Sequence, residues 1–169
     1  DWTGPGGAQL VLRRSDLDAA VLETARGGIV LRGMGYESNE ASVFTNVSAD
    51  HLDLQGIHTL PELAEVKSVV CRITKPDGWT VLNADDPLVL GVARRVRASV
   101  ALFTLADRPG AALRRHLAAG GRAYLVERGW LIEVEGDERR RVVEIASVPV
   151  TIGGIARHNV ANALAAAGG

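Results

Sequence analysis

The chain has 169 residues, of which 47% are hydrophobic and 23% are charged, and its formal net charge is −1. This composition is typical of one globular domain; it excludes an intrinsically disordered chain, and the single cysteine excludes an intramolecular disulfide framework. The near-neutral charge and the lack of a long apolar run indicate a cytoplasmic protein, with no nucleic acid and no membrane as a partner.

Apolar runs that alternate with helical patterns predict an α/β domain with a mainly parallel sheet and flanking helices. The clearest helix extends from Leu60 to about Ile73; Thr59 and Glu62 form a capping box at its start, and a turn over 74–78 closes it. Further helices are expected from Asp86-Pro87 and over about 110–119. The predicted strands are Ala19–Leu22, Ser42–Asn46, Trp79–Leu82 and Val100–Leu105.

Beyond Arg122 the pattern changes to short β-type runs separated by turns. We expect a parallel α/β core over 1–121, a small antiparallel β meander over 122–154, and the start of a terminal helix over 155–169. Both ends look cut, because the chain begins with Asp and ends inside an alanine-rich helical pattern. The four runs of the meander are Ala123–Glu127, Trp130–Glu135, Arg141–Ile145 and Val148–Ile152.

Polar residues follow three of the predicted strands, where ligands bind in parallel α/β sheets. Glu23 ends the first strand and His51 follows the second; both are candidate ligands for Mg²⁺, which takes carboxylates together with phosphate oxygens. A solvated glutamate, and a helix cap beside a surface histidine, are the alternatives. The three segments are Glu23–Gly28, Val47–Asp53 and Asn83–Pro87.

Two further positions stand out on helices. Lys67 projects from an apolar helix face, between Leu63 and Val70, so it either extends to water or is held in a site by a partner. Asn159 and Asn162 are neighbours on the first turns of the terminal helix, where amides either contact a base or act as caps.

Together these segments resemble the central, ATP-binding domain of the Mur ligase superfamily, most closely its cyanophycin-synthetase branch. The Glu23–Gly28 segment is the part typical of that branch, whereas the segments at Asn83 and Arg157 are shared across the superfamily. The resemblance covers nearly the whole chain and rests on Asp1–Pro5, Ala20–Ile29, Thr45–Leu52, Lys67–Val70, Pro76–Gly78, Val81–Pro87 and Arg157–Ala165.

The resemblance implies an ATP-dependent amide ligase with ATP and Mg²⁺ as cofactors. Such enzymes activate a carboxylate as an acyl phosphate, which an amine attacks; in this branch, arginine is joined to the side chains of a poly-aspartate acceptor. Glu23 and His51 would hold Mg²⁺, His51 and Lys67 would be catalytic, and Lys67 falls where Mur enzymes often carry a carbamylated lysine. The implied nucleotide-binding residues are Thr45, Asn46, Asn83, Asp85, Asn159 and Asn162.

The family's phosphate loop and C-terminal lobe are absent from 1–169, so we expect this chain to be a fragment of the ligase. The alternatives are another Mur-type ligase, a non-catalytic domain that keeps the nucleotide-binding fold, and a metal-dependent hydrolase using Asp50, His51 and Asp53. The sequence leaves open which amino acid is added and whether the protein is a homo-oligomer.

Overall fold

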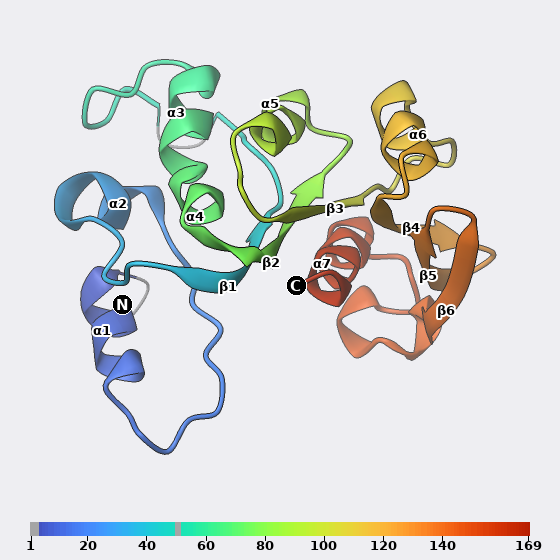
Figure 1. The fold of residues 1–169 in the computed structure, drawn as a ribbon, viewed down its shortest axis with the longest axis horizontal. Helices are drawn as coiled ribbons and strands as arrows, with labels where there is room; N and C mark the ends of the chain where they lie inside the picture. Colours follow the sequence, from blue (N-terminus) through green and yellow to red (C-terminus); the bar gives the residue numbers. More distant parts are fainter. Residues whose placement is uncertain (1–3, 50–51) are drawn as a thin grey trace.

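The computed structural model describes residues 4–49 and 52–169 and is built on one six-stranded sheet in the order β1-β2-β3-β4-β5-β6 (Figure 1). Strands β1 to β4 are parallel, and β5 and β6 continue the sheet in antiparallel pairing. The predicted α/β class, with a mainly parallel sheet and a small meander, is confirmed. The strands are β1 (Asn39–Phe44), β2 (Thr74–Asn83), β3 (Ser99–Phe103), β4 (Arg122–Glu127), β5 (Trp130–Glu135) and β6 (Glu138–Glu144).

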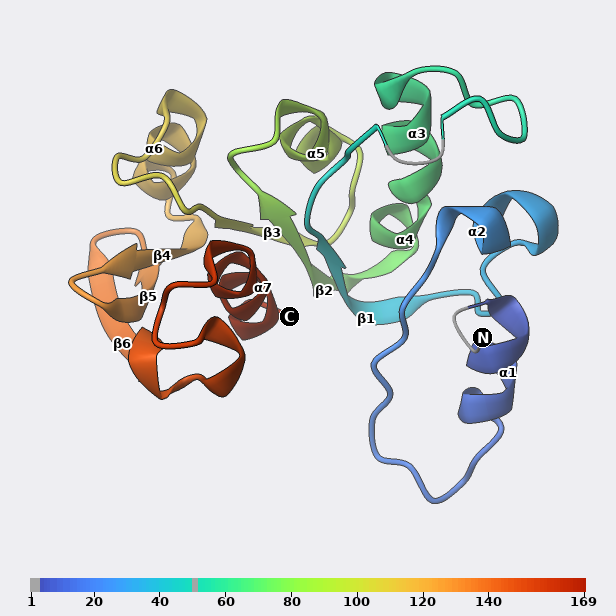
Figure 2. The same cartoon turned by 180° about the vertical axis from the view of Figure 1, so that it is seen from behind.

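Helices cover both faces of the sheet (Figures 1 and 2). Four of them, α3 (Leu60–Lys67), α4 (Val69–Arg72), α5 (Pro87–Gly91) and α6 (Ala111–Ala118), lie on one face, and α7 (Arg157–Ala167) lies on the other. None of the helices in the described ranges is long and apolar enough to cross a membrane. The remaining elements are α1 (Pro5–Leu12) and α2 (Arg26–Arg32), near the β1 side of the sheet, and the 3-10 turns η1 (Val92–Arg94), η2 (Ile145–Ser147) and η3 (Pro149–Thr151).

The sheet separates two hydrophobic clusters. On the α7 face, Leu164 packs with Val81, Phe103 and Tyr124, and burial raises the pKa of the Tyr124 hydroxyl. The cluster on the other face joins α4, α5 and α6 to the strands; its buried members are Phe44, Cys71, Leu82, Val89, Val92, Leu102, Leu113 and Ala123. Burial also raises the pKa of the Cys71 thiol to about 11, so this thiol stays protonated at neutral pH.

The helix predicted over 60–73 forms in two pieces. Its capping box is confirmed: Thr59 Oγ1 accepts from the Glu62 amide, and the Glu62 carboxylate accepts from the Thr59 amide. The break between α3 and α4 falls at buried Ser68, whose hydroxyl donates to the carbonyl of Glu65 at 2.7 Å. This local bond competes with helix continuation, which explains the break.

The turn expected over 74–78 is part of β2. Asn39 pairs with Thr74, whereas Ala41 pairs with Trp79, so β2 accommodates extra residues opposite a short step of β1. Gly78 lies inside this bulge, where the carbonyl oxygen of Glu40 occupies the space that a Cβ atom would need. The residues typical of turns therefore distort the pairing of β2 with the edge strand β1, but they do not end β2.

Two predicted strands are wrong. The run Ala19–Leu22 has no secondary structure, and Val21 is fully exposed, because no strand of the described chain lies beside it to pair with its backbone. The run 148–152 contains η3 in place of a strand: buried Thr151 donates its hydroxyl to the carbonyls of Ile145 and Val148, which curls the backbone.

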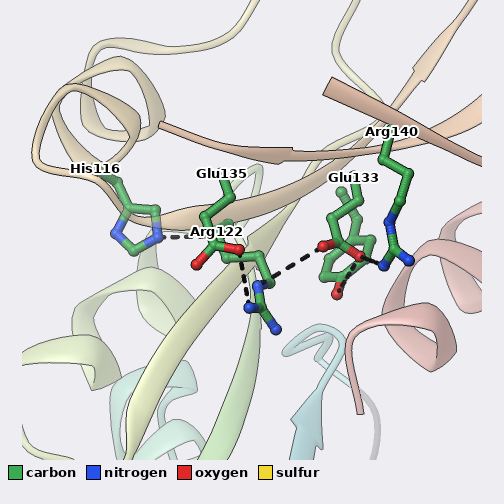
Figure 3. Close-up of polar contacts among 6 residues, drawn as sticks. His116, Arg122, Glu133, Glu135 and Arg140 are labelled. Atoms are coloured by element: carbon green, nitrogen blue, oxygen red, sulfur yellow. Dashed lines mark hydrogen bonds and ion pairs between the residues drawn. The ribbon is translucent and has the colours of Figure 1, made fainter. Parts of the chain in front are cut away.

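The meander is formed by tight hairpins and a charged network (Figure 3). The β4–β5 turn has two residues, Arg128 and Gly129, both with positive φ, as a type I′ turn requires. The Arg122 guanidinium donates to Glu135 at 2.9 Å and lies 4.3 Å from the ring centroid of Trp79 in β2. This cation–π contact links β2 to β4, the strand that pairs with β3 in parallel and with β5 in antiparallel orientation. In the same network, Glu133 accepts from Arg140 at 2.7 Å.

Candidate nucleotide site at the carboxyl edge of the sheet

The carboxyl ends of β1, β2 and β3 meet at one edge because these strands are parallel and adjacent. Asn83, at the end of β2, donates its side-chain amide to the carbonyl of Thr45 at 2.8 Å, just after β1. On the other side, Asp85 accepts from the Thr104 hydroxyl at 2.5 Å and from the Leu105 amide at 2.7 Å, just after β3. The segment after β2 thus ties three strand ends together.

Asp86 adds a second connection to the same edge. One carboxylate oxygen accepts from the Val47 amide at 2.8 Å, beyond the end of β1. The other accepts from the amides of Leu88 at 2.9 Å and Val89 at 3.2 Å, which caps the N-terminus of α5 as the Asp-Pro sequence predicts. A single carboxylate therefore positions both α5 and the segment that leads from β1.

We expect Asp86→Ala to lower the free energy of unfolding by about 2–4 kcal/mol, because it removes an N-cap and a bond to a charged acceptor. Asp86→Asn keeps an oxygen for the cap but loses a second acceptor for Val47, so its cost should be intermediate. Urea denaturation followed by circular dichroism measures both. Asp107→Ala, at an exposed position, is the control and should stay within about 0.5 kcal/mol of the parent. Equal losses for Asp86→Ala and Asp107→Ala would contradict the assignment.

The start of α7 lies at the same edge. Arg157 donates to the carbonyl of Leu105 at 3.4 Å, the residue whose amide binds Asp85. Asn159 does not cap its helix: its amide donates to the carbonyl of Val150 at 2.7 Å and its oxygen accepts from Asn162 at 3.5 Å. The two asparagines are therefore linked neighbours near the start of α7, and Arg157 of the same helix reaches the segment after β3 that Asp85 holds.

The structure shows no polar contact between the predicted metal-binding and catalytic residues within the described ranges. Glu23 does not end a strand; it is exposed, makes no hydrogen bond or ion pair with any described residue, and lines a cavity of about 10 Å³ beside Gly28. Lys67 is half-buried on α3, likewise without a polar partner in the described ranges. His51 lies outside the described residues. Among residues 4–49 and 52–169, no three His, Cys, Asp or Glu side chains gather as a metal site.

Of the remaining predicted residues, Asn46 is exposed and Thr45 is half-buried, and Thr45 contributes its carbonyl to Asn83. Sequence reasoning missed Thr104, whose hydroxyl is buried and bonded to Asp85. The available signal was a hydroxyl residue within an otherwise apolar strand end. A buried hydroxyl needs a partner, and the carboxylates after the neighbouring strand supply it.

A family model described as the Mur ligase middle domain matches residues 7–168. The chain belongs to this family. It is 44% identical over 166 residues to a cyanophycin synthetase of Nostoc sp. and 44% identical over 167 residues to one of Synechocystis sp., in each case over 98% of this chain. It spans only about a fifth of these curated relatives, 18% and 19% of their lengths.

A Mur ligase outside the cyanophycin branch is also similar. The UDP-N-acetylmuramoylalanine–D-glutamate ligase of Symbiobacterium thermophilum is 41% identical over 75 residues, 44% of this chain and 16% of that protein. The similarity to cyanophycin synthetases therefore extends over more of the chain than the similarity to this D-glutamate ligase.

Proposed function

We propose that the chain is the nucleotide-binding part of an ATP-dependent amide ligase that acts in the cytoplasm. The ligase would join an amino acid to an acidic peptide, specifically arginine to the side chains of poly-aspartate. The similarity to cyanophycin synthetases over 98% of the chain supports this substrate class. Because the chain is about a fifth of those proteins, a phosphate loop and a C-terminal lobe would come from other segments of a longer protein.

The observation that carries this proposal is the carboxyl edge itself. Asp85 and Arg157 both bind the backbone of Leu105, just after β3, at the edge where parallel sheets bind nucleotides. Each Asp85 oxygen accepts one bond and keeps a further acceptor position, so Asp85 can still accept a hydroxyl of the nucleotide. The bond between Asn83 and Thr45 stabilises this edge, and Asn46 lies next to it in the chain. Asn159 and Asn162 would contact the base.

In this proposal, Glu23 would hold a magnesium ion. Glu23 offers a carboxylate that no described residue occupies, and Mg²⁺ takes one or two carboxylates together with substrate phosphates. His51 would be the second protein ligand, and Lys67 would act beside it. When bound, the ion neutralises the charge that develops on the phosphates during transfer.

In the proposed reaction, a carboxylate oxygen of the acceptor attacks the γ-phosphorus and ADP leaves. The amine nitrogen then attacks the acyl carbon, phosphate leaves, and the nitrogen gives up a proton. The first step needs the acceptor carboxylate and the γ-phosphate to be held together, and the second needs the amine to be held against the acyl carbon; ordered strand ends favour such positioning.

The test is phosphate release by the full-length protein with poly-aspartate, arginine and ATP. We expect release only when all three substrates are present. Phosphate release with another acidic acceptor or amino acid, but not with poly-aspartate and arginine, would indicate a Mur-type ligase of different specificity. ATP binding without release for any pair would support a non-catalytic domain and overturn the proposal.

A further inference from the structure

A groove at the opposite edge of the sheet has an unusual concentration of positive charge. It has a volume of about 390 Å³ and is lined by Val69, Arg72, Ile73, Arg95 and Arg97. Ile73 directly precedes β2, and Arg97 lies two residues before β3. The groove is therefore at the amino ends of these strands, away from the carboxyl edge where a nucleotide is expected. We call it the arginine groove.

The charges of the arginine groove are only partly neutralised. Arg72 donates to Glu65 at 2.9 Å, and Arg95 forms an ion pair with the other oxygen of the same carboxylate. Arg97 is exposed and makes no hydrogen bond or ion pair with any residue of the described ranges. Three arginines thus line the groove and a single carboxylate, Glu65, pairs with two of them, in a chain whose overall net charge is −1.

We propose that the arginine groove binds a carboxylate-rich stretch of peptide. The Arg72–Glu65–Arg95 arrangement shows that these side chains can hold a carboxylate between them, and Arg97 is available for another. Half-buried Val69 and Ile73 add apolar lining that suits the methylene and backbone atoms of acidic residues. The volume fits a few side chains, as in small-ligand sites of roughly 300–1,000 Å³.

This inference rests on the proposed function, because the acceptor in that function is an acidic peptide. A long acceptor held in the arginine groove stays tethered while another of its carboxylates reacts at the opposite edge of the sheet. Tethering converts the second encounter into an intramolecular one and so raises the effective acceptor concentration. The groove is accordingly a holding site and not part of the reacting centre.

Equilibrium titration of the full-length protein with fluorescent deca-aspartate, without ATP, tests the proposal. Arg97→Gln should weaken binding by about fivefold, as expected for one partly exposed ion pair. Arg94→Gln is the matched control, because Arg94 is exposed in neighbouring η1 but does not line the groove, and it should leave the Kd unchanged. Glu65→Gln should tighten binding about threefold, since it frees Arg72 and Arg95 from their internal carboxylate.

Opposite results would overturn the proposal. Equal weakening of peptide binding by Arg97→Gln and Arg94→Gln would show that the peptide responds only to general surface charge. Weaker binding to the Glu65→Gln protein would show that the ion pairs with Glu65 form the site and do not compete with the peptide. Displacement of the peptide by oligothymidylate or inorganic polyphosphate at equal concentration of charge would make the groove a site for any polyanion. The titration omits ATP, so its failure leaves the ligase assay unaffected, and failure of the ligase assay leaves the titration interpretable.

Discussion

Gly78→Ala is expected to destabilise the protein by at least about 3 kcal/mol, or to prevent folding. A Cβ atom on residue 78 would lie 2.2 Å from the carbonyl oxygen of Glu40, and that oxygen belongs to the backbone of the adjacent strand. A flexible side chain could rotate away, but a strand backbone can yield only by disturbing the β1–β2 pairing. Urea denaturation followed by circular dichroism gives the free energy of unfolding.

Gly91→Ala is the matched control. A Cβ there meets nothing within 4 Å, and Gly91 ends α5 with ordinary helical φ, so alanine should stabilise the protein by about 0.5–1 kcal/mol. The two substitutions add the same methyl group, yet their effects should have opposite signs. A Gly78→Ala protein with the unfolding free energy of the parent would show that the β2 bulge is looser than described.

Lys67→Ala should lower the rate of phosphate release by the full-length protein about 100-fold, while its stability stays within about 0.5 kcal/mol of the parent. The reason for this separation is that Lys67 is half-buried on α3 and makes no polar contact that the described fold depends on. The phosphate-release assay measures the first effect, and thermal or urea unfolding measures the second.

Two further variants define what Lys67 does. If it carries a carbamate, Lys67→Glu should retain more activity than Lys67→Ala, because a carboxylate replaces the carbamate oxygens, and removing dissolved CO₂ should slow the parent enzyme. Lys75→Ala is the control: Lys75 is exposed in β2 and forms an ion pair with Glu40, so its loss should not change the rate. Equal activity of Lys67→Ala and the parent would remove Lys67 from the site.

Sequence patterns predicted best those elements whose partners are also in the described chain. Trp79–Leu82 and Val100–Leu105 find each other as β2 and β3, and the hairpins of the meander follow from turns at Arg128-Gly129 and Gly136-Asp137. The run Ala19–Leu22 has an equally apolar composition but lacks such a neighbour, so it forms no strand and is mostly exposed. Composition indicates that a segment can form a strand, whereas pairing decides whether it does.

The candidate site was predictable where spacing alone sets geometry. The carboxyl edge, the Asp86 cap and the Asn159–Asn162 pair all follow from strand order or helical periodicity. The bonds from Asp85 to Thr104 and Leu105 were not predictable, because they join segments whose separation depends on the register of β2 against β3. The assignment of Glu23 and His51 to Mg²⁺ stays a prediction.

The two-residue turns of the meander have a consequence for how the chain acquires its fold. The β4–β5 and β5–β6 pairings close very short loops, so they cost little chain entropy before their contacts form. The β1–β2 pairing must instead close the long connection through α3 and α4. We therefore expect the β4–β5–β6 hairpins to form before the parallel pairings, and Arg122 of β4, which lies over the Trp79 ring, to contact β2 once the parallel strands have assembled.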